Sequence, residues 1–271
     1  MNLSKEYVNL YDNYLKYINE VNKEIRSIKN MKKRVLKRGD FAPENEVLEL
    51  EGKTIRDIDD VDTKKPKNKI YKFSNGDVYV GKFLEGKMEG KGSYTFFVDE
   101  GTVMEYIGEF KEDKKNGKGN FIFSNGNEYI GYFEEDMMSG IGNMLYSSKA
   151  EYIGTWKNGK KDGKGIYKWS DGCIYAGEFK GGKMEGYGIC YNSKGEVLYE
   201  GEWKNNLIHG KGTYIWEKGK KYIGEFMHGK KHGQGTFYLN NELVYEGTWK
   251  FDKPSIFDRT LDEIFSLRLK L

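Results

Sequence analysis

A short phrase, Tyr-x-Gly-x-aromatic, recurs along the last three quarters of this 271-residue chain. Its eight copies begin at Tyr79, Tyr106, Tyr129, Tyr152, Tyr175, Tyr199, Tyr222 and Tyr245. Five of the seven intervals are 23 residues long, and the other two are 24 and 27 residues. A fixed period of this length is the signature of a repeat protein, in which each short unit packs against its neighbours.

Each copy carries two further fixed features. An aromatic residue lies four positions after the tyrosine in all eight copies: Phe83, Phe110, Phe133, Trp156, Phe179, Trp203, Phe226 and Trp249. The first seven copies have Gly-x-Gly eleven to thirteen positions after the tyrosine: Gly90/Gly92, Gly117/Gly119, Gly140/Gly142, Gly163/Gly165, Gly186/Gly188, Gly210/Gly212 and Gly233/Gly235. Between these features, turn pairs such as Asn158-Gly159 separate two alternating runs, which predicts one β-hairpin per copy.

Hairpins stacked side by side predict a mainly β, single-layer, twisted antiparallel ribbon. Because side chains alternate between the faces of a strand, Tyr152, Gly154 and Trp156 share one face. That face therefore becomes a row of rings separated by glycines. The residue after each repeat tyrosine lies on the other face and is apolar in six of eight copies, at Val80, Ile107, Ile130, Ile153, Ala176 and Ile223. A helix docked on that face would account for this second row.

Composition removes several classes of function. The 45 basic and 42 acidic residues leave a net charge of only +3, so we expect no nucleic-acid binding by net field. Two cysteines, Cys173 and Cys190, make no disulfide framework, and the first residues lack a signal-peptide pattern. Mean hydropathy is −0.79, and no run of about 18 apolar residues is present. A cytoplasmic protein is the expectation.

The repeated Tyr-x-Gly-x-Trp/Phe followed by Gly-x-Gly, at this period, resembles the MORN (membrane occupation and recognition nexus) repeat family. The resemblance covers residues 70–253, with seven full repeats and partial ends. Asp113, Asp136 and Asn206 depart from it by replacing the first turn glycine, and an insertion around residues 97–101 is expected to bulge as a loop between the first two hairpins. The resemblance implies a non-enzymatic scaffold or adaptor at a cytoskeletal, ciliary or axonemal, or membrane-peripheral structure.

Both flanks of the repeats are predicted to contain helices. Residues 1–40 show apolar residues at helical spacing, at Val8, Tyr11, Leu15, Ile18, Val21, Ile25, Ile28 and Val35. Residues 41–69 are a charged linker with a short strand expected at 47–55. Residues 254–271 contain a Thr260-x-x-Glu263 capping signature and apolar residues at helical spacing. We expect this second helix to cap the last strand, to lie in the groove between the rings, or to bind a partner.

No residue constellation indicates catalysis, a cofactor or a metal. His209 and His232 precede a repeat glycine at a position where other copies have Glu, Asn, Ser or Asp, which indicates a turn position rather than a metal ligand. Gly-Lys-Gly segments are followed by strands rather than by the helix that a phosphate loop needs. Cys190 replaces a ring and is interpreted as a small buried apolar residue.

The row of rings has two interpretations: a core between repeats, or an aromatic groove that binds a helix or extended peptide of a partner protein. The candidate groove residues are Tyr129, Phe133, Tyr152, Trp156, Tyr175, Phe179, Tyr199, Trp203, Tyr222 and Phe226. Tyr245 and Trp249 form a candidate homodimer edge. The alternative function is binding to anionic phospholipid, or to an acidic partner, through Lys29, Lys32, Lys33, Arg34, Lys37 and Arg38 of the first helix.

Overall fold

The computed structural model describes residues 4–39, 68–99, 102–217 and 219–255. These residues contain one helix, α1 (Lys5–Arg38), and an open antiparallel sheet. The strands are β1 (Lys69–Lys72), β2 (Val78–Leu84), β3 (Lys87–Asp99), β4 (Thr102–Lys111), β5 (Lys114–Ile122), β6 (Glu128–Glu134), β7 (Met137–Leu145), β8 (Glu151–Lys157), β9 (Lys160–Lys168), β10 (Ile174–Lys180), β11 (Lys183–Tyr191), β12 (Val197–Lys204), β13 (Leu207–Ile215), β14 (Lys220–Met227), β15 (Lys230–Leu239), β16 (Glu242–Lys250) and β17 (Lys253–Pro254).

Chain contacts divide the protein into two compact units. We call residues 9–160 the N-proximal unit, and residues 1–8 with 161–271 the C-proximal unit. Each unit is built from the predicted hairpins, so the mainly β repeat fold with an N-terminal helix is confirmed. The linker, the expected strand at 47–55 and the expected C-terminal helix fall almost entirely on residues 40–67 and 256–271, outside the described residues.

The strand register is the one that the repeat pattern requires. In the hairpin β6–β7, Gly131 pairs with Gly142 and the repeat Tyr129 pairs with Met144. In β10–β11 of the C-proximal unit, Gly177 pairs with Gly188 in the same way. Glycines also face each other in the hairpins β4–β5, β12–β13 and β14–β15, so the ring of the repeat tyrosine can lie over backbone atoms.

The bulged loop that the sequence predicts in the first repeat stays a prediction, because residues 100–101 lie outside the described residues. The described part of the insertion is paired strand with a register shift between Phe97 and Asp99. It lengthens the hairpin β3–β4, in which Phe96 pairs with Met104 and Phe97 with Val103. Phe96 and Phe97 are β-formers, so ladder hydrogen bonds can satisfy their backbone groups here.

Residues at the tight turns connect each repeat to the one before it. Asp136 has a left-handed backbone conformation with φ of 68°. Its N–H donates to the carbonyl of Lys115 at 3.0 Å, and its Oδ1 accepts a hydrogen bond from the N–H of Lys115 at 2.9 Å. Reciprocal bonds of this kind join Asp113 to Met88 and Asn206 to Met184. These Asp and Asn residues therefore replace the turn glycine with a side chain that adds one hydrogen bond between repeats.

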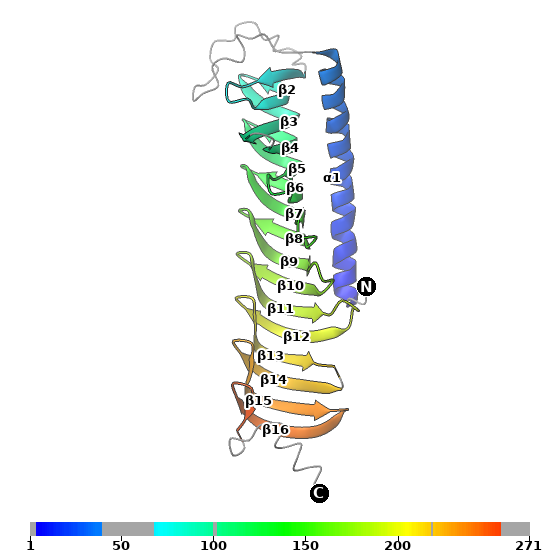
Figure 1. Cartoon of the computed structure of the whole chain (residues 1–271), viewed down its shortest axis with the longest axis vertical. Helices are drawn as coiled ribbons and strands as arrows, with labels where there is room; N and C mark the ends of the chain where they lie inside the picture. Colours follow the sequence, from blue (N-terminus) through cyan, green and yellow to red (C-terminus); the bar gives the residue numbers. More distant parts are fainter. Residues whose placement is uncertain (1–3, 40–67, 100–101, 218, 256–271) are drawn as a thin grey trace. The chain divides into compact units, whose positions relative to one another are not determined.

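Helix α1 covers the face opposite the repeat tyrosines in the N-proximal unit, alongside the strands there (Figure 1). Its buried residues Val21, Ile25 and Ile28 pack against Ile107, and Val35 packs nearby in a second cluster with Ile70 and Val80. The apolar row after the repeat tyrosines is thus a binding surface for this helix.

Ion pairs border the apolar contact between α1 and the sheet. Glu24 lies 3.1 Å from Nζ of Lys118 and 3.9 Å from Nζ of Lys91, and Nζ of Lys32 lies 2.6 Å from Glu105. These pairs set the position of α1 along the sheet in the N-proximal unit. Among the described residues, no helix is long and apolar enough to cross a membrane.

The first turn of α1 belongs to the C-proximal unit and makes contacts of its own there. Glu6 pairs with Lys164 at 2.6 Å, and the N–H of Ser4 donates to the hydroxyl of Tyr191 at 3.1 Å. The Tyr7 side chain is buried beside them.

Candidate aromatic interaction face

Six of the eight repeat tyrosines are held between two edge-on rings. In the N-proximal unit, the centroid of Tyr129 lies 5.1 Å from Phe133 at an interplanar angle of 86°, and 5.3 Å from Trp156 at 85°. In the C-proximal unit, Tyr175 lies 5.2 Å from Phe179 and 5.1 Å from Trp203, at 88° and 80°. Such T-shaped contacts each add about 1 kcal/mol to the burial of the rings. The rings therefore form a continuous ladder within each unit.

The hydroxyl of every repeat tyrosine donates to the carbonyl of the residue three positions later. The acceptors are Lys82, Glu109, Tyr132, Thr155, Glu178, Glu202, Glu225 and Thr248, at 2.9–3.1 Å. Glycine makes room for this ring, because a Cβ on Gly188 would lie 2.5 Å from atoms of Tyr175. The Tyr-x-Gly pattern therefore predicts a tyrosine ring that folds back over its own strand.

The ten candidate groove residues are all buried by this ladder. None of their side chains is more than 9% exposed, and Tyr129, Tyr152, Tyr175 and Tyr222 are fully buried. They form core between repeats and leave little surface of their own for a partner. Direct contact between these ten side chains and a partner stays a prediction.

A second set of rings on the same face remains half-buried, and the candidate site residues chosen from the sequence did not include it. These rings lie fifteen or seventeen positions after a repeat tyrosine, in or directly after the second strand of a hairpin, and we call them the second-strand rings. They are Tyr94, Phe96, Phe123 and Tyr146 in the N-proximal unit, and Tyr167, Trp169, Tyr214 and Trp216 in the C-proximal unit. The signal that identifies them is period-two alternation after Gly-x-Gly, in the same register as the repeat tyrosine.

Six of the eight second-strand rings lie in close pairs. The centroids of Tyr167 and Trp169 are 5.0 Å apart, and those of Tyr214 and Trp216 are 4.3 Å apart. In the N-proximal unit, Tyr94 and Phe96 are separated by 4.4 Å. Each pair presents a half-buried aromatic surface in or directly after the second strand of a hairpin.

Lysine amines lie over several of these rings. Nζ of Lys161 is 4.6 Å from the ring centroid of Tyr167, and Nζ of Lys231 is 4.9 Å from Trp249 and 5.2 Å from Trp216. Burial lowers the pKa of both amines below the ordinary value of 10.5. The same repeat position is methionine in other copies, so the lysine stems fill the space of an apolar side chain.

The histidines and Cys190, which the sequence analysis interpreted as structural residues, lie in the following surroundings. The rings of His209 and His228 lie 5.7 Å apart, and His232 lies beside Phe251. Within residues 4–39, 68–99, 102–217 and 219–255, no three metal-ligating side chains gather. Burial raises the pKa of the Cys190 thiol to about 11, which keeps it protonated at neutral pH.

Five of the six predicted basic residues on α1 are exposed, namely Lys29, Lys33, Arg34, Lys37 and Arg38. Lys32 is different, because its amine contacts Glu105 and Thr95 on the sheet. A helix residue that faces the sheet cannot at the same time face a membrane or a partner. Lys32 therefore belongs to the packing of α1 and should be removed from the basic patch.

The candidate dimer edge lies at the last complete strand. Tyr245 and Trp249 are 7% and 1% exposed, and β17 pairs with one end of β16 through Trp249 and Pro254. Both rings are thus core rather than open surface, and dimerisation through them is a prediction.

Comparison with known proteins agrees with the repeat pattern. The sequence model of the MORN repeat family matches residues 79–97, 106–128, 129–150, 152–174, 175–197, 199–221, 222–243 and 245–255. A search of curated proteins gives no match. Solved structures similar to this chain include the TCP10 domain of Danio rerio CPAP, as wild type and as a point mutant. Each has 13% sequence identity, covers 68% of this chain and 90% of its own, and has a TM-score of 0.30. Because the repeat model covers more than half of the sequence, the chain belongs to the MORN repeat family.

Proposed function

We propose that this protein is a non-enzymatic scaffold that binds a helix or extended peptide of a partner protein on the aromatic face of its repeats. MORN repeats are in general protein or membrane interaction modules, which supports the class of function. The observation that carries the proposal is the set of half-buried second-strand rings, six of them in close pairs, on the same face as the buried ring ladder.

The physical argument rests on the kind of side chain and on its rigidity. Aromatic residues supply most of the strongest contacts at protein interfaces, often 2 kcal/mol or more each. Trp169 and Trp216 directly follow β9 and β13, and their backbone N–H groups donate to the carbonyls of Cys173 and Lys220 at 2.9 Å. These two rings therefore lose little conformational entropy when a partner packs against them. The ten buried candidate residues contribute by holding these rings in place.

We expect the partner to lie at a cytoskeletal, ciliary or membrane-skeleton structure, and this expectation is supported by the family resemblance alone. Microscopy of the tagged full chain tests it. Uniform cytoplasmic signal that does not co-localise with any such structure would contradict it.

Site-specific photocrosslinking tests the aromatic face. A benzophenone amino acid replaces Trp169 on this face, or Met227, which is exposed on the opposite face of the same unit. We expect position 169 to yield a defined crosslinked protein that position 227 does not. The affinity of that purified partner should then fall at least tenfold for Trp216→Ala, which is about 1.4 kcal/mol. Equal crosslinking from both positions, or equal affinity, would reject the aromatic face as the binding surface.

A second candidate function is weak binding to an anionic membrane, favoured by the five exposed basic residues of α1. Each contributes about 1 kcal/mol near an anionic surface, so the binding should be salt-sensitive. The test is co-sedimentation with vesicles of phosphatidylcholine alone or mixed with phosphatidylserine. Reversing the five exposed charges should abolish binding to the mixed vesicles, whereas Lys32→Met should not. Binding that survives the five-fold reversal would exclude this patch.

Homodimerisation through the edge of β16 is also a proposal, supported by the shortness of β17, whose described residues cover only one end of β16. Sedimentation across a concentration series distinguishes the outcomes. A dimer that Leu243→Lys disrupts supports the edge contact, because Leu243 is 45% exposed on β16. A monomer at all concentrations removes it.

A further inference from the structure

The four tight turns of the C-proximal unit carry charge of almost one sign. They join β10 to β11, β12 to β13, β14 to β15 and β16 to β17, and with their flanking residues they comprise 180–183, 204–207, 227–230 and 250–253. We call these residues the turn row. It holds six lysines, all exposed, and one acidic residue, Asp252. The equivalent turns of the N-proximal unit, at 84–87, 111–114, 134–137 and 157–160, hold five lysines and six acidic residues.

The turns of the turn row follow one another along one border of the sheet. The N–H of Asn206 donates to the carbonyl of Met184 at 3.0 Å, and the N–H of Gly229 donates to the carbonyl of Ile208 at 2.8 Å. Each of these turns is therefore tied to the hairpin before it. Neighbouring turns are separated by two strand spacings, about 9.6 Å. The lysines of the turn row thus form a regular line.

The N-proximal unit shows how a lysine at such a turn binds a carboxylate. Nζ of Lys87 lies 3.3 Å from Oε2 of Glu112, and Nζ of Lys114 pairs with Glu135. Both lysines are the eighth residue after a repeat tyrosine, and both glutamates are the sixth residue after the next one. The lysine amine therefore reaches a carboxylate on the adjoining turn.

The turn row has lysines at the same position but no carboxylate to receive them. The sixth residue after the repeat tyrosine is here Gly181, Asn205, His228 or Phe251. Nζ of Lys183 accordingly donates to Oδ1 of Asn205 at 3.1 Å. An amide oxygen carries no net charge, so this contact leaves the charge of Lys183 uncompensated. The carboxylate that completes the N-proximal turns is missing from these turns.

Acidic side chains beside the turn row are held by backbone donors. Oε2 of Glu185 accepts a hydrogen bond from the N–H of Asn205, and Oδ1 of Asp252 accepts one from the N–H of Lys231, both at 2.9 Å. Oε1 of Glu202 also accepts from a backbone N–H, at 2.9 Å. These carboxylates are thus fixed on the sheet by bonds of their own.

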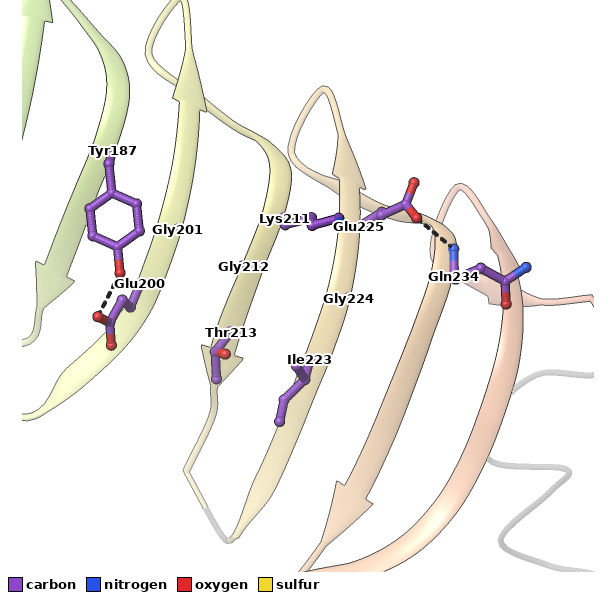
Figure 2. A pocket seen from close by; sticks show the side chains of 10 residues that line it. All are labelled: Tyr187, Glu200, Gly201, Lys211, Gly212, Thr213, Ile223, Gly224, Glu225 and Gln234. Atoms are coloured by element: carbon purple, nitrogen blue, oxygen red, sulfur yellow. Dashed lines mark hydrogen bonds between the residues drawn. The ribbon is translucent and has the colours of Figure 1, made fainter.

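Charges of both signs lie nearer the centre of the same strands. Figure 2 shows Lys211, Glu200 and Glu225 among the side chains that line a shallow depression of about 470 Å³. Glu200 accepts a hydrogen bond there from the hydroxyl of Tyr187 at 2.6 Å. The excess of positive charge is therefore a property of the turn row and not of the whole surface of the unit.

An acidic helix fits the spacing of the turn row. Seven residues of an α-helix rise about 10.5 Å, close to the separation of about 9.6 Å between neighbouring turns. Carboxylates at every seventh residue of one helix stripe would therefore meet successive turns. Leu207 takes the position of Lys183 and Lys230 on the turn between them and is 46% exposed. An apolar side chain on the same stripe can pack on Leu207.

We infer that the turn row binds an acidic amphipathic helix of a partner protein. The carboxylates of that helix take the place on the turn lysines that Glu112 and Glu135 take in the N-proximal unit. Because these ion pairs are exposed, the binding weakens as salt is added. The turn row is a second interaction surface, separate from the aromatic face.

Fluorescence anisotropy of a labelled synthetic peptide tests this inference with the full chain. The probe is a helical peptide of about 22 residues with glutamate at every seventh position and leucines beside them. The tested variant neutralises three lysines of the turn row: Lys183→Gln, Lys204→Gln and Lys230→Gln. The matched control neutralises three N-proximal lysines at the same repeat positions, with the same change in net charge: Lys87→Gln, Lys111→Gln and Lys114→Gln.

We expect the tested variant to bind the probe at least tenfold more weakly than wild type, and the matched control to bind it as wild type does. A shuffled peptide of the same composition, with its glutamates spread around the helix, should also bind at least tenfold more weakly. All six exchanged lysines are exposed, so circular dichroism should show both variants folded.

Several results would overturn the inference. An equal loss of affinity in both triple variants would show that net charge attracts the probe, and absence of binding at low salt would remove the surface. Phosphatidylserine vesicles that bind through these three lysines when the probe does not would assign the turn row to a membrane. Self-association that the tested variant abolishes would assign it to a second copy.

The test is independent of the aromatic face. Met227 belongs to the turn row and Trp169 does not. A protein that crosslinks to position 227 and not to position 169 would therefore support the turn row, whether or not another partner binds the second-strand rings.

Discussion

Raising the pH above 10 should unfold the protein through its repeat tyrosines. Burial raises the pKa of Tyr79, Tyr106 and Tyr129 above the ordinary value of 10.0. All three side chains are fully buried, and each hydroxyl proton is donated to a carbonyl. The folded state therefore favours the protonated form. Its contribution to stability is fully present below pH 10 and is lost as the pH rises toward the folded-state pKa.

The size of the effect follows from the number of tyrosines. Above pH 10, each such tyrosine lowers the free energy of unfolding by about 1.4 kcal/mol per pH unit, because the unfolded chain ionises and the folded chain does not. Burial raises the pKa of Tyr175, Tyr199 and Tyr222 as well. Six tyrosines remove about 8 kcal/mol per pH unit, which is comparable to the whole stability of a typical domain, about 5–15 kcal/mol. We expect cooperative unfolding between about pH 11 and 12.

Circular dichroism and tyrosinate absorbance, followed together against pH, measure this transition. Tyr129→Phe should reduce the pH dependence by one tyrosine, and should cost about 1 kcal/mol at neutral pH through loss of the hydrogen bond to the Tyr132 carbonyl. Tyrosinate absorbance that rises fully near pH 10 while the β-sheet signal stays intact would refute the reasoning. That result would mean that the repeat tyrosines ionise freely in the folded protein.

Three further substitutions test the packing. Gly188→Ala should destabilise by about 2 kcal/mol or more in urea unfolding, because its Cβ would overlap Tyr175. Asp136→Ala should lower the free energy of unfolding by about 1–2 kcal/mol, since the N–H of Lys115 loses its acceptor and alanine disfavours the left-handed turn. Ile25→Ala should cost about 2–4 kcal/mol by leaving a cavity beneath α1, seen as a lower thermal midpoint.

Matched controls separate these mechanisms from general damage. Gly181→Asn changes a glycine with open space around its Cβ position and should cost little. Asp136→Asn keeps the acceptor and the turn, as Asn206 does in another repeat, and should be near neutral. Arg26→Ala removes an exposed side chain of α1 and should not move the midpoint measurably. A control that destabilises as much as its partner would contradict the corresponding contact.

Much of the fold follows from the sequence, because the repeat phrase specifies local geometry directly. The Tyr-x-Gly pattern identifies where a ring can cover backbone. Turn pairs such as Asn205-Asn206, which lies between the paired residues Lys204 and Leu207, fix the hairpin register. The apolar row that includes Ile107 indicates a docked helix, and α1 supplies it in the N-proximal unit. These features are predictable since each depends on residues close together in the chain or at a fixed period.

The candidate site was less predictable, for a physical reason. Whether Tyr129 is groove or core depends on Trp156 of the next repeat, which closes over it from the side. Strand alternation places both rings on one face but does not show how far one covers the other. The same applies to Lys32, whose pairing with Glu105 is set by the rotation of α1 on the sheet. Contacts of this kind are tertiary, so spacing alone cannot assign them.

A paired comparison of Trp169→Ala and Trp203→Ala tests the central claim most directly. Trp169 is half-buried and belongs to the proposed interaction surface. Trp203 belongs to the buried ladder, and its indole N–H donates to the Gly188 carbonyl at 3.2 Å. Trp203→Ala should cost about 3–5 kcal/mol of stability. Trp169→Ala should cost about 1 kcal/mol or less of stability while weakening binding of the photocrosslinked partner at least tenfold. Full-affinity binding by folded Trp169→Ala protein would contradict the claim that the second-strand rings form the interaction surface.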